Sequence, residues 1–212
     1  MAVIGSRPDP EALAAQLSGL PRPWIADIGS GGDPWPDANI LVDKYPGLTV
    51  HRRTNLQTDG KLFVQGDICA LPFRDHSLDF VIASHVIEHL DDPLVGLAEL
   101  QRVSSKGVAW VPSVMGEVAA RVVYPRNISG HRWVGLHERG HGFMFVRYEE
   151  TNPTQWNAVL KALTGSRRYI VTGYGTEMRI AWGWGSWPHR VFARRVRLDE
   201  IVEGNERETE TE

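Results

Sequence analysis

A short apolar stretch that ends in glycines most constrains what this chain can fold into. Residues 24–28 are apolar except for Asp27, and Gly29 and Gly31 follow at once. A run of this kind is typical of a buried strand in a parallel sheet. Glycine adopts backbone angles that other residues resist, and it leaves room for a ligand against the main chain. The stretch therefore predicts a binding turn at the carboxyl end of a strand, where open α/β sheets bind ligands.

Further short runs rich in β-branched and aromatic residues follow along the chain. Most of them close on an acidic residue, a serine or a glycine, and they cover 40–42, 62–64, 78–84 and 108–111. Between the last two, apolar residues at helical spacing predict a helix over 93–103, with Asp92 as its cap and Pro93 as its first residue. Alternating strands and helices predict an α/β fold with a parallel, doubly wound sheet.

The remaining segments complete a single expected domain over 1–198. Helices are predicted over 10–19, 115–123 and 154–163, final strands over 169–171 and 191–193, and an aromatic hairpin loop over 182–188. Residues at about 124–150 have weak periodicity and predict an inserted loop or lid that covers a substrate. The acidic tail 199–212 is too polar to fold and is expected to be disordered.

Composition excludes several classes of protein. The net charge is −3, so the chain lacks the basic footprint of a nucleic-acid binder. A single cysteine, Cys69, excludes an internal disulfide framework and fits a reducing compartment. No apolar run approaches the length of about 18 residues that a membrane span needs, and no signal peptide is apparent. We therefore expect a cytoplasmic protein without a membrane span.

Four motifs in order resemble those of the class I S-adenosylmethionine-dependent methyltransferases, in particular their type 11 branch. They span about 24–112, half of the chain. They are Asp27-x-Gly29-x-Gly31, then Asp43 at the end of the second strand, then Gly66-Asp67-Ile68, then Leu71-Pro72-Phe73 and Leu78-Asp79-Phe80-Val81 followed by Glu88-His89. The resemblance implies a Rossmann-like α/β fold with a seven-stranded, mostly parallel, doubly wound sheet that has one antiparallel strand.

The resemblance also implies S-adenosylmethionine as cofactor and a role for each motif. The glycine loop would lie under the methionine part, Asp43 would accept from both ribose hydroxyls, and Asp67 would accept from the adenine amino group. A carboxylate suits the ribose because it offers two acceptors to two adjacent donors. The expected cofactor-binding residues are Asp27, Gly29, Ser30, Gly31, Asp43, Lys44, Gly66, Asp67, Ile68 and Ser84.

The chain also departs from the family pattern. Asp33 stands where a third glycine is usual, and only eleven residues separate Gly31 from Asp43, so the usual helix there must be short or absent. Each motif also has a structural alternative. The glycines could serve ordinary turns, Asp43 could cap the next segment, and Asp67 could form an Asx-turn before Cys69.

Histidines follow the fourth strand of the expected sheet. His85, Glu88 and His89 would fall at i, i+3 and i+4 on one helical face. This spacing resembles the Glu-x-x-Glu-His metal motif of some O-methyltransferases, with His141 as the distal histidine. We therefore predict His85, His89 and His141 as base or orienting groups, and Glu88 and His89 as ligands of a divalent metal such as Mg²⁺. The alternative is the metal-free chemistry of other type 11 enzymes, and two histidine ligands fit magnesium poorly.

The second half of the chain indicates a polar acceptor. Residues 131–141 hold three histidines and two arginines, and three of the eight tryptophans lie in 182–187. Flat aromatic faces can stack on sugars, although they can equally fill a core or a dimer contact. We predict methyl transfer to a hydroxyl of a small molecule, a mannoside-type sugar. The chain is similar in size and His/Trp content to the mycobacterial sugar 1-O-methyltransferases of methylmannose polysaccharide biosynthesis. A quinone, lipid, nitrogen or carbon acceptor, a non-catalytic cofactor-binding module and a homodimer stay open.

Overall fold

A computed structural model describes residues 3–4, 8–49, 54–117, 130–138, 142–147, 169–170, 177–183 and 193–196. Two compact units make up the chain. Unit 1 comprises Met1–Ile87, Val95–Ala109 and Ala181–Arg190, and unit 2 comprises Glu88–Leu94, Trp110–Ile180 and Val191–Glu212. The organisation of 1–198 as a single domain stays a prediction.

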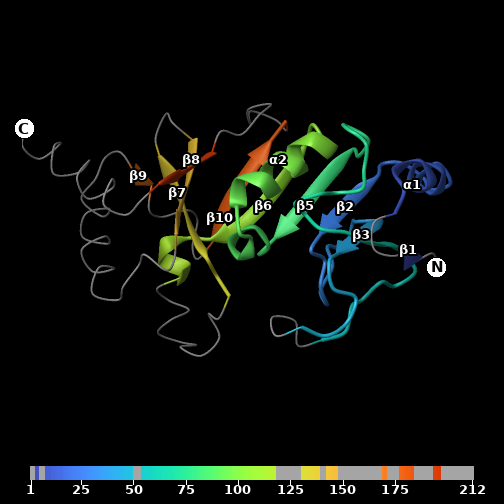
Figure 1. Ribbon diagram of the computed structural model, residues 1–212, viewed down its shortest axis with the longest axis horizontal. Helices are drawn as coiled ribbons and strands as arrows, with labels where there is room; N and C mark the ends of the chain where they lie inside the picture. Colours follow the sequence, from blue (N-terminus) through green and yellow to red (C-terminus); the bar gives the residue numbers. More distant parts are fainter. Residues whose placement is uncertain are drawn as a thin grey trace, which may run out of the picture. The chain divides into compact units, whose positions relative to one another are not determined.

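The larger of the two described sheets has seven strands, in the order β1-β4-β3-β2-β5-β6-β10 (Figure 1). Its strands are β1 (Val3–Ile4), β2 (Ile25–Ile28), β3 (Ile40–Asp43), β4 (Leu62–Gln65), β5 (Phe80–Ser84), β6 (Gly107–Pro112) and β10 (Glu177–Trp182). The pairs β1–β4, β4–β3, β3–β2 and β2–β5 are all parallel. The expected Rossmann-like α/β fold, with its mostly parallel seven-stranded sheet, is confirmed.

The central strands are apolar because neither face of the sheet is left to solvent. In β2, β3, β4 and β5, three of the residues in each strand are fully buried. This burial is the pattern of parallel strands that are covered on both faces. The five predicted strands between residues 24 and 111 are thus confirmed, with their ends shifted by one or two residues.

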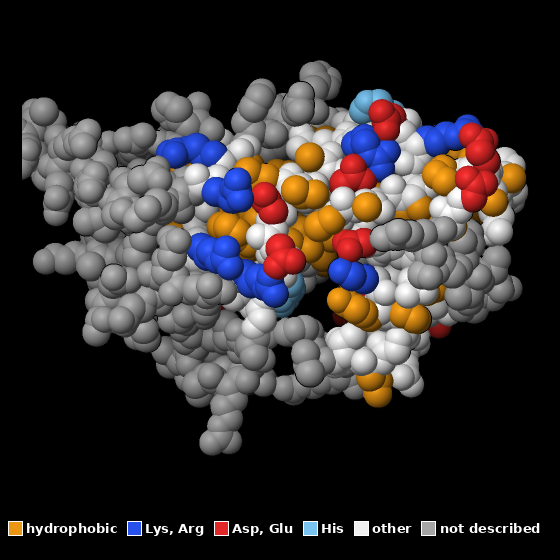
Figure 2. Space-filling view, in the orientation of Figure 1, with side chains coloured by type: hydrophobic (Ala, Val, Ile, Leu, Met, Phe, Trp, Pro, Cys, Tyr) orange, Lys and Arg blue, Asp and Glu red, His pale blue; other side chains and the backbone are white. Residues whose placement is uncertain are grey.

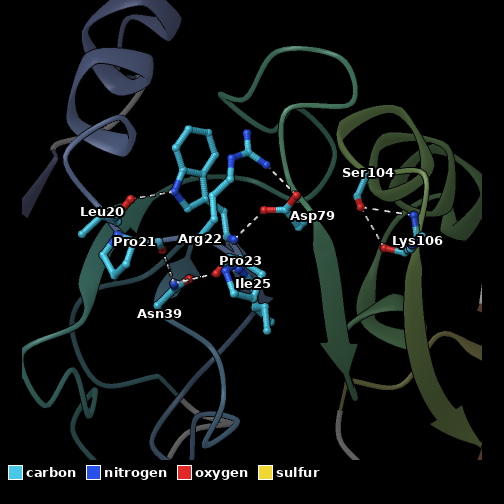
Figure 3. A network of polar contacts seen from close by, with 10 residues as sticks. Leu20, Pro21, Arg22, Pro23, Ile25, Asn39, Asp79, Ser104 and Lys106 are labelled. Carbon is cyan, nitrogen blue, oxygen red and sulfur yellow. Dashed lines mark hydrogen bonds and ion pairs between the residues drawn. The ribbon is translucent and has the colours of Figure 1, made fainter.

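A polar network holds the amino-terminal ends of the central strands (Figure 3). Asp79, just before β5, accepts from the Trp24 backbone N–H at 2.7 Å and pairs with Arg22 at 2.5 Å. Asn39, just before β3, accepts from the Ile25 N–H at 2.9 Å through Oδ1. Because these bonds fix the amino ends of β2, β3 and β5 in register, they also fix where the same strands end.

Two helices confirm the predicted start signals. Helix α1 (Pro10–Leu17) begins after Asp9, whose carboxylate accepts from the N–H groups of Glu11 and Ala12 at 3.4 and 3.3 Å. Helix α2 (Pro93–Val103) begins after Asp92, whose carboxylate accepts from the Leu94 N–H at 3.0 Å. Both start with proline at the first helical position, where the missing N–H costs nothing.

Two strands of the seven-stranded sheet were not predicted, β1 and β10. Strand β10 ends at Trp182, which is fully buried and donates from Nε1 to the Ser104 carbonyl at 3.1 Å. Gly107 lies beneath this indole, since a Cβ at that position would lie 2.3 Å from Trp182 Cζ2. Trp182 is therefore part of the core, and its expected place in a sugar-stacking loop is wrong.

A four-stranded sheet with the order β11-β8-β7-β9 lies in unit 2. Its strands are β7 (Trp133–Glu138), β8 (Gly142–Arg147), β9 (Tyr169–Ile170) and β11 (Ala193–Val196). Strands β7 and β8 are antiparallel, and their central side chains are buried. The prediction of a loop over 124–150 is thus wrong for its described residues. The alternation of apolar and polar residues is weak there because successive residues, 133–136, are all buried.

Several predicted segments lie outside the described residues. They include 118–129, 154–163, 184–188 and the tail 199–212. The predicted final strands at 169–171 and 191–193 coincide in part with β9 and β11, which belong to the four-stranded sheet. On the face that Figure 2 shows, acidic and basic side chains of the described residues lie beside one another. None of the described helices is long and apolar enough to cross a membrane.

Candidate active site

The order in which successive strands are added to the sheet changes direction between β2 and β5. Strands β3 and β4 continue outward from β2 on one side, whereas β5 and β6 continue on the other. In open α/β sheets a ligand binds at such a switch point, outside the carboxyl ends of the strands. Residues 29–31 follow β2 and residues 85–86 follow β5, so these two turns border the switch point in unit 1.

The glycine turn after β2 has the backbone that the sequence predicts. Gly29 and Gly31 have φ values of 77° and 57°, in the left-handed region that favours glycine. The N–H groups of Gly29 and Ser30 both donate to the Val42 carbonyl, at 2.7 and 3.1 Å. A Cβ on Gly29 would lie 2.4 Å from Val86 Cγ2, so the turn after β2 packs directly on the turn after β5.

Asp27 is a buried carboxylate just below this turn. Asp27 is only 4% exposed, and its Oδ2 accepts from the Trp35 N–H at 2.8 Å. Burial raises the pKa of Asp27 to about 6, against the lowering effects of the Trp35 hydrogen bond and of Lys61. Lys61 also donates to the carbonyls of Trp35 and Pro36 at 3.1 and 2.9 Å. Asp27 and Lys61 thus hold the short connection that replaces the usual helix.

Asp43 ends β3 one strand away. Its Oδ2 accepts from the Gly31 N–H at 3.2 Å, and its Oδ1 accepts from the Tyr45 N–H at 2.9 Å. The carboxylate therefore connects the glycine turn to the end of its own strand. Each carboxylate oxygen has two acceptor sites, so these bonds leave capacity for further donors.

Asp67 follows β4, the next strand outward. Its Oδ2 lies 2.9 Å from Lys44 Nζ, and its Oδ1 accepts from the Cys69 N–H at 2.9 Å, which is an Asx-turn. Desolvation would raise the pKa of Asp67, but the hydrogen bonds from Lys44 and Cys69 hold it below the ordinary value. The Asx-turn that the sequence left as an alternative is thus present, and Lys44 joins the ends of β3 and β4.

The remaining predicted cofactor residues lie at the same edge. Gly66 has Pro72 Cδ and Val42 Cγ1 each 3.2 Å from where a Cβ would be, so any side chain there would displace its neighbours. Ile68 is buried, and Ser84 at the end of β5 is exposed. Ser30 is 6% exposed, and its Oγ has no hydrogen-bond partner among the described residues. All ten residues thus lie in or just after the carboxyl ends of β2, β3, β4 and β5, and their role in cofactor binding stays a prediction.

The turn after β5 corrects one prediction. His85 has a φ of 55°, so it cannot be the first residue of a helix. The helical turn that follows is a 3₁₀-helix, η1 (Ile87–His89). His85, Glu88 and His89 therefore do not share one face of an α-helix. His85 is exposed and Glu88 is buried.

Glu88 and His89 instead belong to a cluster of possible metal ligands in unit 2 that was not predicted from the sequence. One donor atom each from Glu88, His89 and His131 lies within 4.8 Å of the others. His131 Nδ1 is 2.6 Å from Glu117 Oε1, and the rings of His89 and His131 have centroids 4.7 Å apart. The predicted distal histidine, His141, lies outside the described residues.

Other polar residues of the 131–141 block are engaged in the fold. Arg132 pairs with Asp91, and Trp133 is buried and donates from Nε1 to the Leu90 carbonyl at 2.9 Å. His137 lies against Phe143 with ring centroids 5.0 Å apart. These contacts give Arg132, Trp133 and His137 structural roles in the fold.

Comparison with known proteins agrees with the fold. Residues 35–111 match the family model described as a methyltransferase domain. An uncharacterised methyltransferase of Schizosaccharomyces pombe is 26% identical over 145 residues, which are 68% of this chain and 49% of the yeast protein. A demethylmenaquinone methyltransferase of Renibacterium salmoninarum is 35% identical over 86 residues, which are 39% of this chain and 35% of that protein. The chain thus spans half or less of the length of these curated relatives.

Solved structures of low similarity include two S-adenosylmethionine-dependent methyltransferases. The protein of Thermotoga maritima has a TM-score of 0.43 and 20% identity, over 57% of this chain and 61% of its own. The protein of Mesorhizobium loti has a TM-score of 0.35 and 17% identity, over 48% of this chain and 53% of its own. The family match covers residues 35–111, about a third of the chain. The matched segment, 35–111, contains Asp43, Asp67 and the turn after β5.

Proposed function

We propose that this protein transfers a methyl group from S-adenosylmethionine to a hydroxyl of a small polar acceptor, a mannoside-type sugar. One observation carries the first half of this proposal. The glycine turn, Asp43 and Asp67 follow three neighbouring parallel strands, and they converge beside the switch point of the sheet. The family match over 35–111 supports the same conclusion.

The residues at this edge fit the cofactor in chemical terms. Asp43 offers carboxylate oxygens to a pair of vicinal hydroxyls. Ser30 Oγ is buried without a hydrogen-bond partner among the described residues, and a buried hydroxyl in that state is costly unless a ligand supplies a bond. Gly29 and Gly31 present backbone rather than side chains. Ile68 gives an apolar surface for a base. When bound, the cofactor supplies a methyl group already activated by its sulfonium.

The chain itself must hold the acceptor in line and, for a hydroxyl, remove a proton. His85 directly follows Ser84 at the carboxyl end of β5 and is exposed. It is therefore our first choice for the base or orienting group, with His89 and His141 as the others. Replacing each of the three by alanine should reduce the rate of methyl transfer for the acting residue by about 100-fold or more. Full turnover in all three variants would remove the assignment.

The cofactor half is tested by isothermal titration calorimetry with S-adenosylmethionine. Asp43→Asn keeps the size of the side chain but removes the charge, and hydrogen bonds to a charged group contribute about 1.5–3 kcal/mol. We therefore expect affinity to fall by about 10- to 100-fold. Asp59→Asn is the matched control because Asp59 is exposed in a distant turn and should bind as the wild type does. Equal affinity of both variants, or no binding by the wild type, would refute the site.

The acceptor is the finer part of the proposal. The histidine- and arginine-rich segment after residue 130 supports a polar, hydroxyl-bearing molecule. Trp133 and Trp182 are buried, whereas Trp35 is 41% exposed, and Trp184 and Trp187 lie outside the described residues. Transfer of labelled methyl to a panel of mono- and disaccharides tests this part. Turnover only with other classes of acceptor would refute the sugar assignment.

A quinone precursor is the second candidate. It is favoured by the identity of 35% with the demethylmenaquinone methyltransferase, over a segment of 86 residues. The same panel should include a demethylated naphthoquinol. Cofactor binding without turnover on any acceptor class would instead favour a non-catalytic binding module.

A further inference from the structure

We propose that Glu88, His89 and His131 bind one first-row divalent transition-metal ion such as Zn²⁺, and that Glu117 positions His131 for this role. All four residues belong to unit 2. Glu88 and His89 come from η1, whereas His131 comes from the segment that leads into β7. The proposal does not depend on the proposed cofactor, because metal binding is measured without it.

The donor atoms have nearly the spacing that an ion requires. The three donors lie within 4.8 Å of one another. Two ligands that are each about 2.1 Å from a zinc ion can be at most about 4.2 Å apart. The largest separation must therefore shorten by at most about 0.6 Å around an ion.

The backbone holds the two contributing segments together. The Arg132 N–H donates to the Glu88 carbonyl at 2.8 Å, and Trp133 Nε1 donates to the Leu90 carbonyl at 2.9 Å. The two hydrogen-bond acceptors, Glu88 and Leu90, flank His89, and the two hydrogen-bond donors directly follow His131. The donors are therefore placed by the fold and not by flexible surface loops.

Both histidines are oriented through the same ring nitrogen. His89 Nδ1 lies 3.0 Å from the Gly130 carbonyl oxygen, and His131 Nδ1 lies 2.6 Å from Glu117 Oε1. A carbonyl or carboxylate accepts only from a protonated Nδ1, so in the neutral rings Nε2 carries the lone pair. Histidine ligands of metals typically have this arrangement, with a backbone carbonyl or a carboxylate behind the ring.

Burial and charge point to a cation. Glu88 and Glu117 are each 1% exposed, and Glu117 Oε2 has no hydrogen-bond partner among the described residues. A buried carboxylate oxygen is costly unless a hydrogen bond or a cation satisfies it. A divalent ion bound to this group would supply that cation.

The ligand types select the kind of metal. Two imidazole nitrogens and one carboxylate oxygen suit Zn²⁺, Co²⁺ or Mn²⁺, whereas Mg²⁺ prefers an all-oxygen shell. The predicted magnesium site with His141 is thus replaced by a transition-metal site with His131. Three protein ligands also leave a coordination position open, as in catalytic zinc sites.

The test is zinc titration of the full chain, purified without an affinity tag and treated with chelator. Calorimetry should give one equivalent of bound Zn²⁺, and Co²⁺ should give visible ligand-field absorption bands. His131→Ala and His89→Gln should each weaken binding by about 100-fold or more, and Glu117→Gln by about 10- to 100-fold. His76→Asn is the matched control, since His76 is exposed with a φ of 50°, and it should bind as the wild type does.

Circular dichroism establishes that each variant is folded. Because the wild type alone gives the stoichiometry and the Co²⁺ spectrum, the proposal stays testable if a variant fails to fold. Absence of stoichiometric binding by the wild type would overturn it. So would binding that His131→Ala and His89→Gln leave unchanged. A third overturning result is a thermal midpoint of the wild type that one equivalent of Zn²⁺ leaves unchanged.

Discussion

The buried carboxylate of Asp27 should make the protein less stable as pH rises, and Asp27→Asn should remove this dependence. Asp27 is 4% exposed, and its pKa is raised from 3.8 to about 6 chiefly by burial. A carboxyl whose pKa is raised by folding binds its proton more tightly in the folded state. Its contribution to stability is therefore complete below pH 3.8 and is lost as pH rises through about 6.

The size of the effect follows from linkage. Each pKa unit corresponds to about 1.36 kcal/mol, so the difference between 3.8 and about 6 amounts to about 3 kcal/mol at neutral pH. About half of this loss has already occurred at pH 5. The free energy of unfolding of the wild type relative to Asp27→Asn should therefore fall by about 1.4 kcal/mol between pH 5 and pH 7.5.

Asparagine suits this comparison because its Oδ1 can still accept from the Trp35 N–H, the bond that Asp27 Oδ2 makes at 2.8 Å. The assay is urea denaturation of both proteins at the two pH values, without cofactor. Asp59→Asn, at an exposed position, should differ from the wild type equally at both. A free energy of unfolding of the wild type minus that of Asp27→Asn that is constant with pH, or that increases as pH rises, would refute the argument.

Two further predictions concern packing and the strand ends. Gly107→Ala should lower the free energy of unfolding by about 1–3 kcal/mol, because its Cβ would lie 2.3 Å from the Trp182 ring; Gly47→Ala, which has nothing within 4 Å, should be near neutral in thermal denaturation. Lys44→Met should raise the pKa of the Asp67 carboxyl, because the ammonium 2.9 Å away now lowers it; a ¹³C NMR titration of the side chain measures this, and an unchanged pKa would contradict the assignment.

The central strands of the first half of the chain could be predicted because their signals are local. Each central strand is a short apolar run that ends in a glycine, a serine or an acid, and parallel strands share one edge for their carboxyl ends. Positions such as Asp43 and Gly66 therefore need only be at a strand end to be placed correctly. The helix starts at Asp9 and Asp92 were equally readable, since cap and proline stand side by side in the sequence.

The second half could not be predicted in the same way. Strands β7 and β8 are buried along most of their length, so the alternation that marks a half-exposed strand is missing. Strand β10 and Trp182 belong to a sheet whose other strands lie far away in the chain. An aromatic residue near glycines reads as a loop until its partner, here the Ser104 carbonyl, is known.

The cluster of Glu88, His89 and His131 shows what residue spacing alone could not predict. Glu88 and His89 are neighbours in sequence, and an α-helix would have added His85 on the same face. The φ of 55° at His85 separates it from them, and the contacts between the 88–90 and 130–133 segments bring in His131 instead. His131 was visible in the sequence only as one of three histidines in a polar block. What distinguishes it is Glu117 at its Nδ1, a pairing between residues that are 14 apart and that belong to different elements. The proposed ligand set thus depends on the acceptor behind each histidine, a carboxylate for His131 and a backbone carbonyl for His89, and only the fold provides that information.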